Sequence, residues 1–571
     1  MNHLVIPITV VAPDASRQRK RQAPRGRRVD PGALADVQRL LGDESRQPDL
    51  LIEHLHKIQD HYAHLSAPHL AALAQEMRLA QAEVYEVATF YHHFDVVKEG
   101  LAVPAPLTVR VCESLSCEMA GARDLLAKLP GLLGREVRVI AAPCIGRCEQ
   151  APAVVVGQNP VPNASCEEVV AAVKAGAVKH VPQGFIGYEA YDAAGGYALL
   201  RQCVAGERDV EAVIKTMEDS GLRGLGGAGF PAGRKWRIVK AEPGPRLMAV
   251  NIDEGEPGTF KDRSLLERDP HRFLEGMLIA AWAVGIKKVY IYLRDEYHGC
   301  RAMLEEELAK MRAAPPAPGM PQIDLRRGAG AYICGEESAM IESIEGKRGM
   351  PRLRPPYVAQ VGLFGRPTLE HNLETLYWVR ELLEKGGAWF GSHGRNGRKG
   401  LRSFSVSGRV RQPGVKLAPA GITIQELIDE YCGGMLDGQT FYAYLPGGAS
   451  GGILPATMNN IPLDFDTLQP YGCFIGSAAV MVLSDRDTAS DAARNMMRFF
   501  HHESCGQCTP CRVGTAKASH LMEQPRWNLP LLADLSLVMR DSSICGLGQA
   551  APNPADCVVK YFPHELVGAS R

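Results

Sequence analysis

Three cysteines near the C-terminus are spaced closely enough to bind one metal centre. Cys505, Cys508 and Cys511 are separated by two residues each, in the run Ser-Cys-Gly-Gln-Cys-Thr-Pro-Cys-Arg. Such spacers let each sulfur turn toward one side of a tight loop, and a cubane cluster needs this cup plus a fourth thiolate from elsewhere. Cys545, in Ser-Ile-Cys-Gly-Leu-Gly, is the best candidate for the fourth ligand. The pattern predicts a [4Fe–4S] cluster.

Zinc and unligated thiols are the competing interpretations of these cysteines. Structural zinc sites usually pair two Cys-x2-Cys knuckles, or one knuckle with two histidines. Here three ligands follow one another and the fourth is distant, which favours iron–sulfur. His501 and His502 lie just upstream of the cluster. We interpret them as surface or supporting residues rather than as ligands.

A second set of four cysteines precedes the central part of the chain. Cys112 and Cys117 form one pair, and Cys144 and Cys148 form the other. Each pair follows a predicted strand, and loops at one end of a sheet converge. Four thiolates from two such loops suit a [2Fe–2S] cluster. The spacing matches neither plant ferredoxins nor a pair of zinc knuckles, so the presence of the other cluster strengthens this prediction.

A glycine-rich run opens the large central region. Gly224, Gly226 and Gly227 lie in Gly-Leu-Gly-Gly-Ala-Gly-Phe-Pro, and Lys235 follows. Glycine lets backbone N–H groups approach a phosphate and permits positive φ, and a lysine can neutralise an anion. No Gly-Lys-Ser/Thr follows, and the third glycine falls too early for the usual dinucleotide fingerprint. A nucleotide or flavin loop and a flexible turn both remain open.

Two acidic stretches accompany the glycine run. One covers residues 251–258 (Asn-Ile-Asp-Glu-Gly-Glu-Pro-Gly), and the other covers residues 332–337 (Tyr-Ile-Cys-Gly-Glu-Glu). Carboxylates and amides suit the hydroxyls of ribityl and ribose groups, although each stretch alone is equally compatible with a solvated acidic turn. Asn372 and Thr375 can add polar contacts to a cofactor edge.

Composition narrows the class of protein. The 571 residues include 15 cysteines, and 64 basic residues balance 64 acidic ones. Zero net charge gives no general case for binding nucleic acid or acidic membranes. No apolar stretch approaches the length of a membrane span, and the basic residues follow the first apolar run, the reverse of a secretory signal. We therefore expect a cytoplasmic protein whose cysteines bind metal.

The periodicity of apolar residues predicts a multidomain α/β protein that positions these groups. Helical stripes come first, then alternating short strands and helices, a larger α/β region, a strand-rich region and final helices. The expected parts are a disordered basic tail (1–33), a helical bundle (34–103), a small α/β domain (104–182), a larger α/β domain (183–400), a region of the size of a ubiquitin-like β-grasp domain (401–486) and a helical cluster domain (487–571).

The glycine run, the two acidic stretches and the C-terminal cysteine run together resemble the NADH-binding flavoprotein subunit of respiratory complex I and its soluble relatives. Residues 34–182, including Thr-Phe-Tyr at 89–91 ahead of four cysteines, resemble the 24 kDa thioredoxin-like subunit of that complex. The resemblance covers nearly everything after the tail. It implies a thioredoxin-like [2Fe–2S] domain fused to a Rossmann-like domain for FMN and NAD(H).

The resemblance also implies which residues hold the cofactors. FMN would lie on the glycine loop, and NAD(H) would stack on the flavin. The implied FMN residues are Gly224, Gly226, Gly227, Lys235, Asn251, Asp253, Glu336, Asn372 and Thr375; the implied NAD(H) residues are Phe230, Glu256, Tyr332, Glu337 and Tyr357. Two positions depart from the family pattern. His371 replaces the first residue of an Asn-Asn pair, where it could shift the flavin potential, and Tyr357 replaces a phenylalanine.

Fusions of this kind resemble the diaphorase (β) chain of soluble NAD-dependent formate dehydrogenases that use molybdenum or tungsten, and also the flavoprotein chain of NAD-reducing hydrogenases. Retention of all four thioredoxin-domain cysteines favours the first. The expected function is electron exchange between NAD(H), FMN and [4Fe–4S], with hydride transfer by FMN and no catalytic side chain. The expected partner is a molybdopterin formate dehydrogenase subunit. A non-catalytic iron–sulfur or zinc scaffold and an NADH-binding redox sensor are the other hypotheses.

Overall fold

The computed structural model describes residues 26–566, so the expected basic tail lies outside the described residues as far as residue 25. Helix α1 (Pro31–Leu41) begins before residue 33, the expected end of that tail. The reason is a local cap: the Asp30 carboxylate accepts the backbone N–H of Ala33 at 2.8 Å, and Pro31 suits the first helical turn. The tail prediction was therefore too long at this end.

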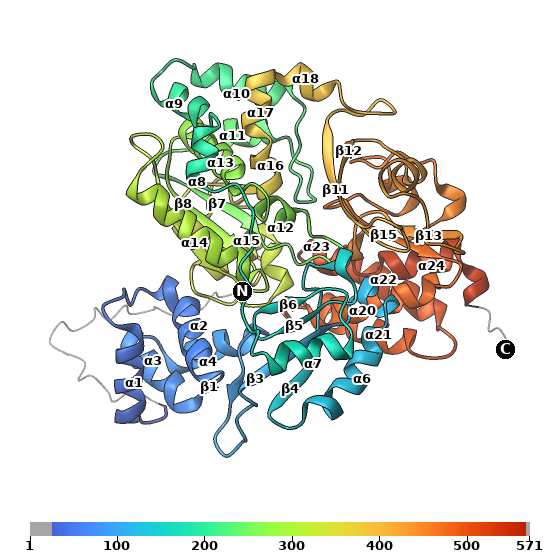
Figure 1. The fold of residues 1–571 in the computed structure, drawn as a ribbon, viewed down its shortest axis with the longest axis horizontal. Coiled ribbons are helices and arrows are strands. Elements are labelled where there is room, and N and C mark those ends of the chain that lie inside the picture. The colour runs from blue at the N-terminus through green and yellow to red at the C-terminus, as the bar shows by residue number, and fades with distance from the viewer. Residues whose placement is uncertain (1–25, 567–571) are drawn as a thin grey trace, which may run out of the picture.

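Four helices and a short ribbon form the N-terminal region. Helix α1 is followed by α2 (Leu51–Tyr62), α3 (Ala67–Met77) and α4 (Gln81–Phe90), and β1 (Leu65–Ser66) pairs in parallel with β2 (Val96–Val97). Buried side chains from the helices, such as Val37, Leu55 and Leu73, form their core. In Figure 1 this region lies below the larger α/β domain.

A four-stranded sheet with its own apolar core follows. Its strands are β3 (Leu107–Cys112), β4 (Val137–Ala142), β5 (Val154–Val156) and β6 (Asn159–Val161), in the order β4-β3-β5-β6. β3 and β4 are parallel, and β5 and β6 form an antiparallel hairpin against β3. Helices α5 (Leu115–Met119), α6 (Ala122–Leu133) and α7 (Cys166–Lys174) complete this domain. The alternation of short strands and helices was predicted here, except for β6.

The central domain is built on a four-stranded, fully parallel sheet. Its strands are β7 (Arg246–Ile252), β8 (Ile286–Leu293), β9 (Gln322–Arg327) and β10 (Thr368–Asn372), in the order β10-β7-β8-β9. The chain moves from β7 outward to β8 and β9 and then returns to the other side of β7. Ligands of such sheets bind at the carboxyl ends of the strands where this reversal occurs. Asn251 and Asn372 are register partners at that point.

Helices cover both ends and faces of this domain (Figure 1). Helix α13 is almost wholly buried and packs on α16 and α17. The helices of the domain are α8 (Tyr188–Ala193), α9 (Ala198–Val204), α10 (Val210–Asp219), α11 (Ala232–Ala241), α12 (Lys261–Leu266), α13 (Pro270–Val284), α14 (His298–Ala313), α15 (Glu337–Ile344), α16 (Leu373–Tyr377), α17 (Val379–Lys385) and α18 (Gly387–Gly391).

A five-stranded mixed sheet comes next. Its strands are β11 (Leu401–Gly408), β12 (Gly414–Pro419), β13 (Phe441–Leu445), β14 (Leu454–Pro455) and β15 (Ala479–Ser484), in the order β12-β11-β15-β13-β14. Its first and last strands, β11 and β15, are parallel neighbours, and the other pairs are antiparallel. The helix predicted here is split: α19 (Ile424–Glu426) continues as a π-helical turn over Leu427–Tyr431.

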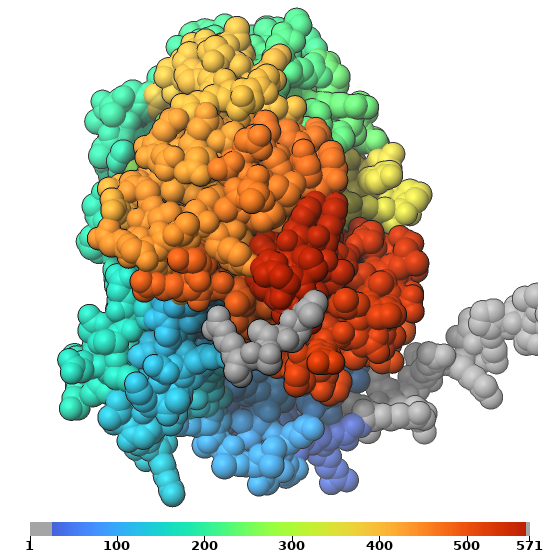
Figure 2. Space-filling model, turned by 90° about the vertical axis from the view of Figure 1, so that its right-hand side faces the viewer, coloured from blue at the N-terminus to red at the C-terminus, as the bar shows by residue number. Residues whose placement is uncertain are grey.

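The C-terminal region is helical. Its helices are α20 (Ala489–His502), α21 (Thr509–Met522), α22 (Leu529–Ser542), α23 (Gly546–Ala550) and α24 (Asn553–Tyr561). Figure 2 shows these helices (red) directly against the five-stranded sheet (orange) and close to the small sheet domain (cyan) on one continuous face. None of the helices between residues 26 and 566 is long and apolar enough to cross a lipid bilayer.

Close packing of α13 on α16 predicts a strong effect of one methyl group. A Cβ at Gly276 would lie 1.9 Å from the carbonyl oxygen of Leu376. We therefore expect Gly276→Ala to lower the free energy of unfolding by about 2 kcal/mol or more, through a forced shift of backbone. The midpoint of urea unfolding, followed by circular dichroism, measures it.

Gly131 in α6 provides the matched control. A Cβ there meets nothing within 4 Å, so Gly131→Ala should be neutral or stabilise by up to about 1 kcal/mol. An unchanged midpoint for Gly276→Ala would contradict the tight packing of α13.

Candidate functional site

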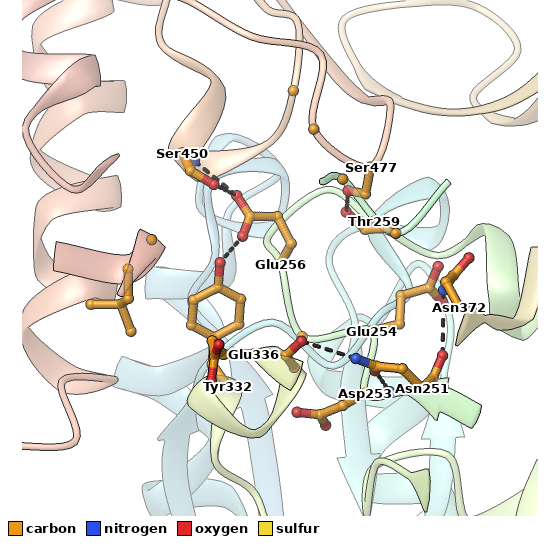
Figure 3. A pocket seen from close by; sticks show the side chains of 18 of the residues that line it. Asn251, Asp253, Glu254, Glu256, Thr259, Tyr332, Glu336, Asn372, Ser450 and Ser477 are labelled. Atoms are coloured by element: carbon orange, nitrogen blue, oxygen red, sulfur yellow. Dashed lines mark hydrogen bonds between the residues drawn. The ribbon is translucent and has the colours of Figure 1, made fainter. Parts of the chain in front are cut away.

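A cavity of about 300 Å³ lies at the switch point of the parallel sheet. Three parts of the chain meet there: the central domain, the loops of the five-stranded sheet, and helix α23 beside Cys545 (Figure 3). Its wall consists of Gly226, Gly227, Asn251, Asp253, Glu254, Gly255, Glu256, Thr259, Lys261, Asp262, Tyr332, Ile333, Gly335, Glu336, Asn372, Gly447, Ser450, Phe474, Gly476, Ser477, Gly546, Leu547 and Ala550.

The structure brings eight of the residues expected to hold FMN or NAD(H) into this wall and leaves six outside it. Those in the wall are Gly226, Gly227, Asn251, Asp253, Glu256, Tyr332, Glu336 and Asn372. Those outside it are Gly224, Phe230, Lys235, Glu337, Tyr357 and Thr375. The two acidic stretches and the glycine run, which are far apart in sequence, therefore converge on one cavity.

The glycine run is shaped for a close approach. At Gly226 a Cβ would lie 2.9 Å from the Cβ of Asn372, and Gly227 adopts φ +119°, which L side chains rarely adopt. The backbone N–H of Leu225 donates to the hydroxyl oxygen of Thr375 at 2.9 Å. Thr375 is thus buried behind the loop and holds it in place. The hollow that a side chain would fill is left open toward the cavity.

A buried carboxylate oxygen without a partner tests whether FMN fits. Asn251 donates from Nδ2 to the Gly335 carbonyl at 2.9 Å and accepts the backbone N–H of Asp253 at 3.1 Å. The Oδ2 atom of Asp253 has no hydrogen-bond partner among residues 26–566. Burial raises the pKa of this carboxyl well above its usual range. A ligand with hydroxyl groups, such as a ribityl chain, supplies the partner that this oxygen lacks, so the residues present fit the flavin.

A buried lysine in the wall was not anticipated. Lys261 is 1% exposed, and its Nζ lies 2.7 Å from Asp262, 3.2 Å from Glu374 and 3.2 Å from the amide oxygen of Asn372. Burial opposes its charge, but the carboxylates of Asp262, Glu374 and Glu254 outweigh burial and raise the pKa of Lys261. The ammonium therefore stays charged and fixes the orientation of Asn372.

Glu256 lies between Tyr332 and Ser450 in Figure 3. One carboxylate oxygen accepts the Tyr332 hydroxyl, and the other accepts the hydroxyl of Ser450 and its backbone N–H, the latter at 2.8 Å. Burial raises the pKa of Glu256 despite these hydrogen bonds. The chain of contacts joins the central domain to a loop of the five-stranded sheet, 194 residues later in the sequence.

Two aromatic side chains expected to stack on NAD(H) are exposed. Phe230 is 38% exposed and Tyr357 is 56% exposed, values unusual for large apolar residues that have no ligand to cover them. Arg354 anchors the segment before Tyr357, because its guanidinium pairs with Glu336 and, at 2.9 Å, with Glu337. Glu336 is itself in the cavity wall, so this segment borders the cavity.

His371 corrects an expectation about the flavin. Its Nε2 accepts the indole N–H of buried Trp236 at 2.8 Å, and burial lowers its pKa well below the usual value. Because side chains alternate along strand β10, His371 points away from Asn372 and is absent from the cavity wall. The histidine is neutral and belongs to the core, so it has no contact through which to shift the flavin potential directly.

Several wall residues escaped the sequence analysis because they come from the five-stranded sheet. Gly447, Ser450, Phe474, Gly476 and Ser477 follow strands of a separate domain. The run Pro-Gly-Gly-Ala-Ser-Gly-Gly at 446–452 was a usable signal, since clustered glycines permit close backbone approach. Nothing in the spacing, however, indicates that this loop faces the first glycine run.

The four C-terminal cysteines gather beside the cavity. Cys505, Cys508 and Cys511 lie around the start of α21, and Cys545 precedes α23. Burial raises the pKa of Cys511 to about 11 and that of Cys545 to about 12, although the backbone N–H groups of residues 547 and 548 donate to the Cys545 sulfur. Such thiols become thiolates by binding metal. Gly546 and Leu547 are in the cavity wall, so the cluster loop touches the flavin cavity directly.

The other four cysteines also converge, as the parallel pairing of β3 and β4 requires. Cys112 ends β3, and Cys144 follows β4 at the same edge of the sheet. The sulfurs of Cys144 and Cys148 are 3.4 Å apart. Hydrogen bonds to Cys117 and Cys144 and burial raise the pKa of Cys112. Four buried thiols at hydrogen-bonding distance are the cup that a [2Fe–2S] cluster requires.

Buried Arg294 connects this second cluster loop to the flavin cavity. Its guanidinium donates to the carbonyl of Cys144 at 2.7 Å and to the carbonyl of Glu254 at 2.6 Å. A small neighbouring cavity is lined by Cys144 on one side and by Asp253 and Tyr332 on the other. The [2Fe–2S] loop is therefore packed against the flavin cavity, as the [4Fe–4S] loop is.

This arrangement predicts a selective loss of one cluster. Replacing Cys545 by Ser should remove the electron paramagnetic resonance signal of the reduced [4Fe–4S] cluster and leave that of [2Fe–2S], because serine is a poor substitute for a thiolate ligand. Cys432→Ser is the control, since Cys432 is buried in the five-stranded domain away from both sets. Loss of both signals in Cys545→Ser alone would indicate that the clusters are not independent.

Comparison with known proteins agrees with these sites. Residues 217–381 match the Nuo51 FMN-binding domain, residues 491–568 match the NADH-ubiquinone oxidoreductase-F iron–sulfur binding region, and residues 37–176 match the thioredoxin-like [2Fe–2S] ferredoxin family. The matches coincide with the central cavity, the C-terminal cysteines and the small sheet domain. FMN, NAD(H), [4Fe–4S] and [2Fe–2S] are thus the cofactors of this chain, as predicted.

Relatives that match over longer stretches point the same way. An NADH-quinone oxidoreductase flavoprotein of the F type from Rhizobium meliloti is 40% identical over 401 residues, covering 68% of this chain and 95% of that protein. The mitochondrial NADH dehydrogenase [ubiquinone] flavoprotein 1 of Dictyostelium discoideum is 39% identical, covering 62% of this chain and 78% of that protein. A crystal structure of an NAD⁺-reducing [NiFe]-hydrogenase in the H₂-reduced state superposes with a TM-score of 0.81 at 32% identity, covering 91% of this chain and 93% of that chain. The chain belongs to the family of NADH-binding flavoproteins of the NADH-quinone oxidoreductases, in a form fused to a thioredoxin-like [2Fe–2S] domain.

Proposed function

We propose that this chain is the diaphorase component of an NAD-dependent formate dehydrogenase. In that role it reduces NAD⁺ with electrons from formate, which a partner chain carrying molybdenum or tungsten oxidises. The family relationship already makes the chain an NADH-oxidising type of flavoprotein with iron–sulfur clusters. The proposal adds the direction of electron flow and the identity of the partner.

One observation carries the relay itself. The wall of the flavin cavity includes both the glycine run, through Gly226 and Gly227, and the residues directly after Cys545. FMN supplies the step between the two-electron chemistry of nicotinamide and the one-electron chemistry of a cluster. The protein's task is to hold nicotinamide, flavin and cluster within contact of one another, and positioning of this kind needs no acid or base side chain.

The cavity supports the following division of roles. Gly224, Gly226 and Gly227 offer backbone N–H groups to the FMN phosphate, and Lys235 adds positive charge nearby. Asn251, Asp253, Glu336 and Asn372 face the ribityl chain and ring, with Thr375 holding the loop. Phe230 and Tyr357 stack on NAD(H), while Tyr332, Glu256 and Glu337 bind its polar groups. A carboxylate at Glu256 near the adenosine ribose disfavours the 2′-phosphate of NADP.

The domain assignments extend this proposal. The strand order β12-β11-β15-β13-β14, with parallel β11 and β15, supports a ubiquitin-like β-grasp domain over residues 401–486. The four N-terminal helices and the five C-terminal helices support small helical bundles at 34–103 and 487–571. In this proposal the β-grasp domain closes the cavity over the flavin, since Gly447, Ser450 and Gly476 belong to it.

Retention of all four thioredoxin-domain cysteines supports formate dehydrogenase as the complex. The flavoprotein chain of an NAD-reducing hydrogenase is the second candidate, and the superposition with such an enzyme favours it. In both cases the substrate is converted on another chain.

Co-purification distinguishes these candidates. The full complex, isolated by a tag on this chain, should contain a molybdopterin protein with molybdenum or tungsten and should reduce NAD⁺ when formate is added. Recovery of a nickel protein with hydrogen-dependent NAD⁺ reduction would establish the second candidate and contradict the first. Zinc without iron or flavin in the isolated chain would contradict both and indicate a scaffold.

The unpartnered oxygen of Asp253 gives a prediction for FMN. Asp253→Ala should weaken FMN binding about tenfold to a hundredfold, the usual effect of losing a buried hydrogen bond whose other partner is left unsatisfied. Quenching of flavin fluorescence on titration of the flavin-free protein measures it. Asp541→Ala at the end of α22 is the control, because Asp541 is exposed and absent from the cavity wall. Equal FMN affinity in both variants would remove Asp253 from the flavin site.

A further inference from the structure

Three side chains outside the flavin and cluster sites meet where the N-terminal region touches the cluster domain. His92 follows helix α4, while His502 and Glu503 end helix α20. One ligand atom from each lies within 4.8 Å of the others. We propose that His92, His502 and Glu503 form a binding site for a divalent transition-metal ion, for which Zn²⁺ is the natural probe.

The spacing of the three groups suits a tetrahedral ion. The Oε1 atom of Glu503 lies 3.1 Å from Nδ1 of His502 and 3.9 Å from Nδ1 of His92. The two imidazole rings are 4.2 Å apart between centroids. Bonds of about 2.1 Å in a tetrahedral site place neighbouring ligand atoms about 3.4 Å apart. Small rotations of two side chains therefore bring all three atoms to coordinating positions.

The carboxylate of the site is already oriented by the fold. The side chain of Glu503 is 3% exposed, and its Oε2 accepts the backbone N–H of Tyr332 at 3.0 Å. The remaining oxygen faces the two histidines. A buried anion fixed by one hydrogen bond binds a cation at low entropic cost, because it need not be immobilised on binding. The histidines are 43% and 49% exposed, so an ion can enter from solvent.

The charges around the site favour a cation. Glu296 lies near His92, and Glu113 lies near His502. Among residues 26–566, no lysine or arginine forms an ion pair with Glu503; its charged contacts are His92 and His502. The carboxylate is therefore not neutralised by a competing side chain.

A second histidine cluster shows what a competing side chain does. His56, His93 and Asp295 also bring ligand atoms within 4.8 Å. There the guanidinium of Arg327 donates to Asp295 at 2.6 Å and stays beside it, paired also with Asp60. A permanent cation already occupies that carboxylate, so a dication would be repelled. The site at His92 lacks this obstacle.

The donor set defines the class of ion. Two imidazoles and one carboxylate, with water as a fourth ligand, match the ligands that zinc and similar borderline ions take, whereas calcium and magnesium prefer oxygen alone. The bound ion would tie His92 of the N-terminal region to the end of α20. It would thereby hold the thioredoxin-like half of the chain against the half that carries [4Fe–4S].

Zinc binding to the iron-loaded, flavin-loaded protein tests the proposal. Equilibrium dialysis against micromolar ZnCl₂ without oxygen, followed by metal analysis, should show one zinc per chain beyond any background. His92→Ala and His502→Ala should each weaken this binding at least tenfold. Glu503→Gln should do the same while its amide oxygen still accepts the N–H of Tyr332, so that lost charge rather than lost folding explains the result.

His501→Ala is the matched control, since His501 is exposed, adjacent in sequence and outside the cluster. It should bind zinc as the unmodified protein does. Zinc should also raise the midpoint of thermal unfolding in the unmodified protein and in His501→Ala but not in His92→Ala. All variants should keep their NADH–ferricyanide rate without zinc, which shows that they fold.

Two outcomes would overturn the assignment. One is an unmodified protein that binds no zinc at micromolar concentration. The other is equal zinc binding by His92→Ala, His502→Ala and the unmodified protein, which would locate the zinc elsewhere, for example on cysteines that lack iron. Neither outcome bears on the proposed diaphorase function, which the flavin, iron and formate measurements test separately.

Discussion

A single buried guanidinium holds the two sides of the electron path together. Arg294 is 4% exposed and donates to the carbonyl of Cys144 in the [2Fe–2S] loop and to that of Glu254 in the flavin cavity. Its charge is balanced by Glu296 at 2.9 Å. Removing one member of such a buried set costs about 3–5 kcal/mol because the others remain unpaired. The fusion of two domains in one chain depends on this contact for its geometry as much as on the covalent link.

The flavin cavity is acidic, and burial is the cause of its unusual titration. Burial raises the pKa of Glu254 to about 7 and that of Glu370, behind Asn251, to about 8. The folded state therefore holds protons that the unfolded chain releases above about 4.5. Because these folded pKa values are raised, the neutral carboxyls fit the fold, and stability falls as the pH rises from about 4.5 toward 8. A site that binds a polyhydroxyl flavin accepts this cost, since its carboxyl groups must face inward.

Much of the architecture was predictable because local patterns report local structure. The strand before Cys112, the helix from Gln81 and the strand Lys288–Tyr292 appeared as expected within β3, α4 and β8. The tail boundary was wrong because a capping aspartate starts α1 earlier than composition suggests. The single helix at 424–431 became a short helix and a π-helical turn, a change of hydrogen-bonding register that periodicity does not encode. The role of His371 was misjudged for a related reason: only the direction of its side chain on β10 separates it from the cavity.

The sequence by itself determined the chemistry of this protein: eight cysteines in two sets, a glycine run and two acidic stretches specify clusters, flavin and nicotinamide, and the order of these motifs specifies the family. These are properties of residue type and spacing, which a chain carries before it folds. Only the tertiary structure decided what lies next to what. It placed α23 and the loop at 446–452 against the first glycine run, put Lys261 in the cavity wall, and brought His92 to Glu503. Contacts between segments hundreds of residues apart arise from packing of separate domains, and no local pattern records them.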